Sequence, residues 1–130
     1  MRTSELSGAA LQHAVMLAEG WTYVPNDGIQ CSAYCRIVDS TARWTIKGPN
    51  YLAGPAGDDI IDREKIDTRH IKRRAHCWEA RIDRRSVEQP PITARAATRR
   101  EAAMRAWVAH NLGDEIKLPE DLRCDANNAG

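Results

Sequence analysis

The sequence predicts an α+β fold, in which a small antiparallel sheet of about four to five strands packs against two helices near the termini. Two stretches with apolar residues at helical spacing open and close the chain. Short stretches of alternating apolar and polar residues lie between them. The chain has 130 residues, no internal repeat and no long linker. We therefore expect a single domain over residues 1–130.

The first helix is predicted over residues 7–19. Ser7 is a suitable N-cap, and Gly20 supplies the residue with positive φ at which helices often end. Apolar residues recur between them every three to four positions, which predicts that one face of this helix is buried. These residues are Leu11, Ala14, Val15 and Ala18.

Three strands are predicted over residues 21–24, 29–37 and 42–46. Pro, Asn, Asp, Ser and Thr residues separate them and favour the tight turns of an antiparallel meander. Every second residue of the second strand is apolar, and in the third strand Trp44 alternates with Ala42 and Ile46. Each of these two strands is therefore predicted to have one apolar face.

Residues 48–57 are predicted to form a loop, because they include three glycines and two prolines. The element that follows is short and of uncertain type. Asp58 or Asp59 could cap a helix over residues 60–66, which is the ordinary role of acidic residues beside a loop.

A fourth strand is predicted over residues 74–83, where His76, Trp78 and Ile82 share one face. Residues 84–97 are predicted to be an exposed connection, since Pro90-Pro91 interrupts them.

The end of the chain predicts a helix followed by a strand. Thr98 and Glu101 form a capping box for a helix over residues 98–112, and Gly113 ends it. Residues 115–118 then alternate in polarity, so a short strand is expected before Pro119.

Tryptophans, apolar runs and cysteines indicate the core and the cellular compartment of the protein. The chain has no phenylalanine, so its four tryptophans are expected to supply the bulk of the core: Trp21, Trp44, Trp78 and Trp107. No apolar run reaches the length of about 18 residues that a membrane span needs, so no membrane partner is expected. We expect a cytoplasmic protein whose cysteines remain thiols.

Charge is unevenly distributed along the chain. Residues 63–105 hold 13 Arg and Lys against 6 Asp and Glu, although the net charge of the whole chain is only +1. The acidic flanks could neutralise this basic stretch. Alternatively, the region 69–100 could bind an anion such as a nucleic acid or a nucleotide. The arginines chosen for such a site are Arg73, Arg74, Arg99 and Arg100.

No metal or cofactor site is predicted. On a strand, Cys31 and Cys35 would lie about 13 Å apart, which is too far for both to bind one zinc ion. Carboxylates cluster over residues 58–64 and leave a small metal-dependent hydrolase as a further alternative. No residue is assigned a catalytic role, so an enzyme is the less favoured class.

The two ends of the sequence resemble the NinX-type small proteins of tailed phages and prophages. The matching segments are TSELSGAALQHAVMLAEG near the N-terminus and AAMRAWVAHNLGDEIKLPEDL near the C-terminus. Gly54-Pro55 and the segment 60–66 are also similar to a central motif of that family. The resemblance implies a phage or prophage accessory protein that is made in a bacterial cytoplasm.

The favoured hypothesis is a non-enzymatic protein that binds a host or phage macromolecule, most naturally a protein. Trp44, Tyr51 and the loop 48–57 are the residues chosen for such a site, because loops on a rigid scaffold often carry function.

Overall fold

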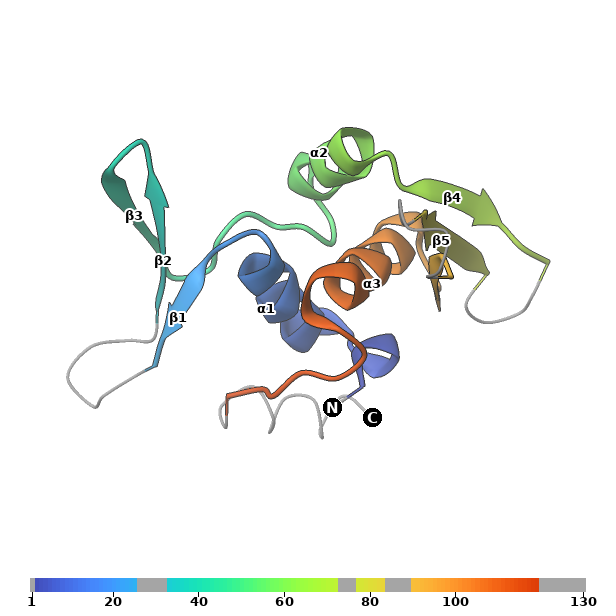
Figure 1. The fold of residues 1–130 in the computed structure, drawn as a ribbon, viewed down its shortest axis with the longest axis horizontal. Coiled ribbons are helices and arrows are strands. Elements are labelled where there is room, and N and C mark those ends of the chain that lie inside the picture. Colours follow the sequence, from blue (N-terminus) through green and yellow to red (C-terminus); the bar gives the residue numbers. More distant parts are fainter. Residues whose placement is uncertain (1, 26–32, 73–76, 84–89, 120–130) are drawn as a thin grey trace.

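The computed structural model describes residues 2–25, 33–72, 77–83 and 90–119 (Figure 1). The expected α+β class is confirmed, but the strands form two antiparallel sheets of three strands each instead of one sheet. The first sheet contains β1 (Thr22–Val24), β2 (Ala33–Val38) and β3 (Thr41–Thr45). The second contains β4 (Asp67–His70), β5 (Trp78–Ile82) and β6 (Ile92–Ala96). The helices are η1 (Thr3–Glu5, 3₁₀), α1 (Gly8–Ala18), α2 (Pro55–Glu64) and α3 (Arg99–Leu112).

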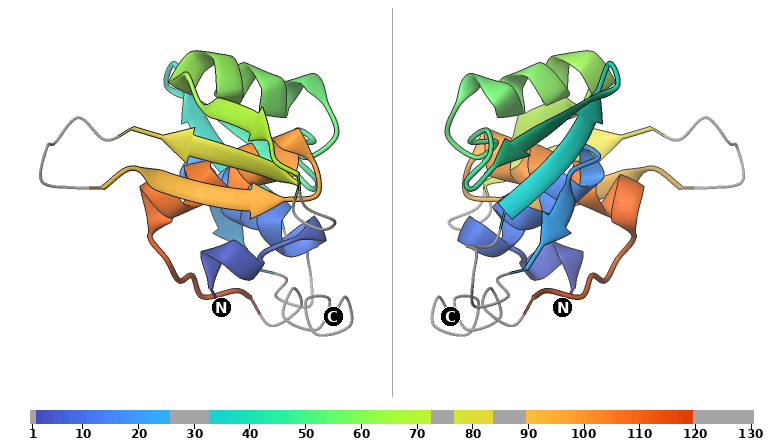
Figure 2. Two further views of the ribbon diagram at one scale, coloured as in Figure 1. Left: turned by 90° about the vertical axis from the view of Figure 1, so that its right-hand side faces the viewer. Right: turned by 90° about the vertical axis from the view of Figure 1, so that its left-hand side faces the viewer.

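Helix α3 is the centre of the molecule. It packs against α1, α2, η1 and all three strands of the second sheet (Figures 1 and 2). Every residue from Ala102 to Val108 is buried as a result. The sequence predicted an amphipathic helix here. The middle of α3 is instead buried on all sides, because Ala102, Ala103 and Ala106 are small enough to let neighbouring elements approach the helix closely.

The second sheet covers α3 with one face (Figure 2, left). Ala80 and Ile82 of β5 and Ile92 and Ala96 of β6 are buried there. Strand β6 falls where an exposed connection was expected, so that prediction was wrong. Three of its five residues carry side chains no larger than that of threonine, and two prolines precede it, so its alternation gives a weak signal. Strand β4 was also missed.

Helix α1 agrees with its prediction to within one or two residues. Ser7 occupies the N-cap position, although its side chain makes no capping hydrogen bond. Leu6 and Leu11 are fully buried beside it. The tryptophans were only partly predicted correctly: Trp21 and Trp107 are buried, but Trp44 is exposed.

Helix α2 begins within the predicted loop. Pro55 occupies the first turn, where a missing N–H costs nothing, and Gly54 is the N-cap in place of Asp58 or Asp59. Gly57 allows this helix to lie close to the preceding chain, since a Cβ atom there would come within 2.1 Å of the Tyr51 carbonyl oxygen.

One of the two hydrogen bonds of the predicted capping box is formed at the start of α3. Thr98 Oγ1 accepts a hydrogen bond from the Glu101 N–H at 3.2 Å. The Glu101 carboxylate binds Arg105. The strand expected over residues 115–118 is not formed; the described chain has a single bridge between Arg2 and Glu115 instead.

Candidate interaction surface

Four large hydrophobic side chains are exposed among the described residues, and all four belong to the first sheet or directly follow it. Ile37 and Ile46 are each 66% exposed, Trp44 is 62% exposed and Val24 is 37% exposed. Single exposed apolar residues are common on protein surfaces, whereas a contiguous group marks a site of interaction.

The register of the first sheet places these side chains on one face. Cys35 lies opposite Trp44, Ile37 opposite Ala42, and Val24 opposite Ala33. Paired residues of an antiparallel sheet point to the same side, and every second residue along a strand does too. Ile46 continues the alternation and lines a shallow hollow with Ala33 and Trp44. We call this surface the apolar face: Val24, Ala33, Cys35, Ile37, Ala42, Trp44 and Ile46.

The opposite face of the first sheet holds it on the body of the protein (Figure 1). Tyr34 is buried, and its hydroxyl lies 2.6 Å from Nδ1 of His13 in α1. The guanidinium of Arg36 lies 4.5 Å from the centre of the Trp21 ring. The inner face is therefore built from aromatic and cationic side chains, and the regular apolar alternation points outward.

Tyr51 does not share the surface of Trp44. It is 4% exposed and belongs to the hydrophobic core, and burial raises the pKa of its hydroxyl. Its N–H donates to Oε1 of Gln12 at 3.0 Å, which fixes the start of the loop against α1. Of the two aromatic residues chosen from the sequence, only Trp44 is available to a partner.

The chosen arginines divide into two groups. Arg73 and Arg74 lie outside the described residues. Arg100 donates two hydrogen bonds to the Asp58 carboxylate, at 3.0 and 2.8 Å, and Arg99 lies 3.7 Å from the same group. These hydrogen bonds lower the pKa of Asp58. The anion that Arg99 and Arg100 hold is thus a side chain of α2.

The outer face of the second sheet is neutralised in the same way. Glu79 accepts hydrogen bonds from Arg69 and Arg95 on the two neighbouring strands, at 3.1 and 3.0 Å. Arg95 is the main cause of the lowered pKa of Glu79. Arg81 pairs with Asp83 at 2.9 Å. Within the described part of the basic region, each of these arginines has a carboxylate partner.

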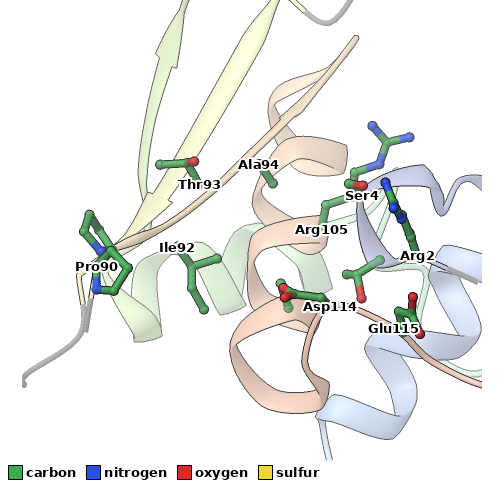
Figure 3. A pocket seen from close by; sticks show the side chains of 12 residues that line it. Arg2, Ser4, Pro90, Ile92, Thr93, Ala94, Arg105, Asp114 and Glu115 are labelled. Atoms are coloured by element: carbon green, nitrogen blue, oxygen red, sulfur yellow. The ribbon is translucent and has the colours of Figure 1, made fainter. Parts of the chain in front are cut away.

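A groove of about 680 Å³ lies between η1, β6 and the end of α3 (Figure 3). Arg2, Asp114 and Glu115 line one side, and Pro90 lies at the other end. Arg105 also borders it, but its guanidinium is engaged. That group donates to the carbonyl oxygens of Leu6 and Arg95, both at 2.7 Å, and to Glu101 at 3.0 Å. Arg105 therefore joins three parts of the fold.

Candidate metal ligands and thiols are dispersed over the described residues. No group of three or more His, Cys, Asp or Glu side chains there could hold a metal ion. Cys35 and Cys77 are free; Cys35 belongs to β2 and Cys77 directly precedes β5, while Cys31 and Cys124 are outside the described residues.

A scan against protein families matches residues 2–111 to the model described as Bacteriophage P22, NinX. The chain belongs to the NinX family. The match runs through the middle of the chain as well as both of the segments that carried the resemblance, and so it covers both sheets and nearly all of α3. In a comparison with curated proteins, none matches this NinX family member. None of the helices in the described part of the chain is long and apolar enough to cross a membrane.

Proposed function

We propose that this NinX family member is a non-enzymatic phage accessory protein that binds a host or phage protein through the apolar face of its first sheet. The observation that supports this most strongly is the collection of all four exposed large hydrophobic side chains of the described residues on one face. Burying apolar surface stabilises a complex by about 25 cal/mol per Å², so binding of a partner that covers this face is favourable.

The apolar face is open, whereas arginines of the basic region are already paired, and this contrast favours a protein over a nucleic acid as the partner. Phosphate binding needs cationic groups that can exchange water or counterions for phosphate. Arg69, Arg95 and Arg100 are already bonded to carboxylates of the same chain. An anion would have to displace Glu79 or Asp58 before it could use them.

The test is affinity capture from phage-infected cells with the wild-type protein and a double variant, Ile37→Ser and Ile46→Ser. Both isoleucines are 66% exposed, so the double variant should fold normally. We expect a stoichiometric protein to be retained by the wild type and lost by the variant. The matched control is Arg81→Ser, which changes an exposed residue of the second sheet and should retain the partner.

Salt separates this proposal from the anion-binding alternative. An apolar contact should survive moderate salt, whereas a phosphate-based contact should weaken steeply. Loss of the captured partner in Arg81→Ser but not in the double isoleucine variant would contradict the proposal.

A further inference from the structure

The inner face of the first sheet carries two arginines that lie directly opposite each other. Arg36 of β2 pairs in register with Arg43 of β3, and paired residues of an antiparallel sheet point to the same side. The guanidinium of Arg36 lies over the Trp21 ring, so both arginines belong to the side opposite the apolar face. Like charges in such a pair destabilise a sheet unless another group neutralises them.

No carboxylate of the described residues neutralises this pair, because none of the ion pairs found there includes Arg36 or Arg43. Burial raises the pKa of the Tyr51 hydroxyl, and the charges of Glu19 and Arg36 both act on that pKa, so the two groups share this region. Glu19 is nevertheless taken by Arg63, which donates to its two oxygens at 3.0 and 2.7 Å. The positive charge of the arginine pair is therefore left without a counterion in the described part of the chain.

Two buried donors beside this pair have no acceptor. They are Nε of Arg36 and Nε1 of Trp21, and they are the only buried side-chain nitrogen or oxygen atoms of the described residues without a hydrogen-bond partner. Trp21 is 7% exposed, and the guanidinium carbon of Arg36 lies 4.5 Å from its ring centre, so both donors are in one place. Buried donors are nearly always satisfied, so two neighbouring exceptions indicate that an acceptor binds here.

The charge of the pair distinguishes between two kinds of acceptor. A water molecule would satisfy an N–H group but would leave the like charges of Arg36 and Arg43 opposed, whereas an anion does both. A phosphate monoester carries a charge of about −1.5 to −2 and three strong acceptor oxygens, which match two guanidinium groups. A carboxylate compensates only one of them.

The arginine pair is accessible to a small anion. Arg36 is only partly buried and Arg43 is exposed. The β2–β3 hairpin that carries both residues extends away from α1 and α3 (Figure 1). An anion can therefore reach the two guanidinium groups from solvent without opening the core.

We propose that Arg36 and Arg43 bind the phosphate group of a small phosphate monoester on the inner face of the first sheet. Arg36 supplies a planar fork of donors that the Trp21 ring holds in place, and Arg43 supplies the second positive charge from the rim. This site lies outside the basic region 69–100 and on the opposite side of the sheet from the apolar face, so it is separate from the proposed protein-binding function.

The first test is a titration of the full chain with inorganic phosphate and with glycerol 3-phosphate, followed by NMR at the indole N–H resonances of the four tryptophans. We expect a saturable shift of the Trp21 resonance with both compounds, and Trp21→Phe identifies that resonance by its absence. Acetate at equal ionic strength should leave it in place. No shift of this resonance up to millimolar concentrations overturns the proposal. An equal affinity for acetate, or binding of inorganic phosphate without glycerol 3-phosphate, overturns the assignment to a phosphate monoester.

A matched pair of variants tests the place of binding. Arg43→Gln and Arg81→Gln each remove one positive charge from an exposed strand residue, the first beside Arg36 and the second in the other sheet. We expect the Kd for glycerol 3-phosphate, measured by calorimetry, to rise about 5- to 30-fold in Arg43→Gln and less than about 2-fold in Arg81→Gln. Arg43→Gln removes a like charge opposite Arg36, so the variant should remain folded without ligand. Equal Kd values for the two variants overturn the site.

Arg36→Lys tests the role of the guanidinium fork. This variant keeps the positive charge but loses the planar set of donors, so we expect the Kd to rise about 10-fold. Glycerol 3-phosphate should also raise the Tm of this variant less than that of the wild type, because ligand stabilisation follows affinity. An unchanged Kd in a folded variant overturns the role of Arg36.

Phosphate binding and protein binding can fail separately. The double variant Ile37→Ser and Ile46→Ser should keep the wild-type Kd for glycerol 3-phosphate, and Arg43→Gln should keep the captured protein partner. Loss of phosphate binding in the double isoleucine variant would place the anion on the apolar side and overturn the site. Failure of partner capture with intact phosphate binding bears only on the proposed function.

Discussion

The two sheets have the same number of strands and the same simple order, yet their free surfaces differ in kind. The outer face of the second sheet carries Arg69 and Arg95, which pair with Glu79 between them, and Arg81, which pairs with Asp83 at the end of β5. The corresponding surface of the first sheet carries Ile37, Trp44 and Ile46. One sheet has its apolar side against α3 and its charged side in water, and the other exposes its apolar side.

The edges differ in the same direction. Strand β6 is preceded by Pro90 and Pro91, which cannot donate to a further strand, and the carbonyl oxygen of Arg95 already accepts from Arg105. Among the described residues, strand β3 has neither a preceding proline pair nor a backbone carbonyl that accepts from an arginine side chain. The difference teaches that the second sheet is completed within one chain, whereas the first sheet has the features of an interface.

The largest expected effect compares isoleucines of the two sheets. Ile82→Ala should lower the free energy of unfolding by about 2–5 kcal/mol, because it leaves a cavity beside α3. Ile37→Ala should lower it by no more than about 0.5 kcal/mol, because Ile37 is already in water. Urea denaturation with an unchanged m value measures both. Similar losses for the two variants would show that the apolar face is covered within the monomer.

The next effect concerns the residue that blocks the β6 edge. Arg105→Met should cost about 3 kcal/mol of unfolding free energy, since it leaves the carbonyl oxygens of Leu6 and Arg95 without their donor. The control is Arg99→Met, which alters a more exposed arginine of the same helix and should cost less than about 1 kcal/mol. Equal costs in chemical denaturation would mean that Arg105 has no special structural role.

A smaller effect tests how the first sheet is held. Tyr34→Phe removes the hydroxyl beside His13 and should cost about 1 kcal/mol. Hydrogen exchange should rise in β1–β3 more than in β4–β6, because the lost contact joins only the first sheet to α1. Trp44→Leu, on the opposite face, should leave exchange unchanged. A uniform rise across both sheets would contradict this separation.

The smallest effect is a pH dependence that belongs to the second sheet. The pKa of Glu79 lies below its ordinary value of 4.5, chiefly because of Arg95. Its ion pairs therefore stabilise the fold fully above that pH and cease to do so as the pH falls through the lower folded-state pKa. Glu79→Gln should remove this part of the acid transition, by less than about 1 kcal/mol, since the arginines are largely exposed. Identical acid limbs for variant and wild type would show that these pairs contribute nothing.

Local signals in the sequence predicted the parts of the fold that depend on neighbouring residues. The cap at Thr98, the stop after α1 and the turn at Asp39 each arise from backbone chemistry within a few positions, and each is found. The start of helix α2 at Pro55 and the whole of strand β6 were missed for the opposite reason. Gly57 of α2 lies against the Tyr51 carbonyl, and the small residues of β6 pack on α3, so both elements depend on contacts that their own residue patterns do not reveal.

Of the residues chosen for a partner site, Trp44 is the one that lies on the surface we propose as the interface, and it was chosen for a different reason. Trp44 was chosen as part of a loop-borne site, whereas it lies on an exposed sheet face away from the buried Tyr51. The alternation around Trp44 correctly predicted a strand with one apolar face. It carried no information on which side of the sheet the helices would lie, and the core was the natural but incorrect expectation for Trp44.

By itself, the sequence determined the α+β class, two helices, the meander of the first sheet and the likeness to the NinX family, because these depend on short-range periodicity, caps and motifs. Only the tertiary structure decided that the strands divide into two sheets, that Arg69, Arg81, Arg95 and Arg100 of the basic region find counterions within the chain, and that the apolar face points outward. These outcomes depend on contacts between residues far apart in sequence. Periodicity states that a strand has an apolar side, but the packing of α1 on the Tyr34 side decided which side water meets.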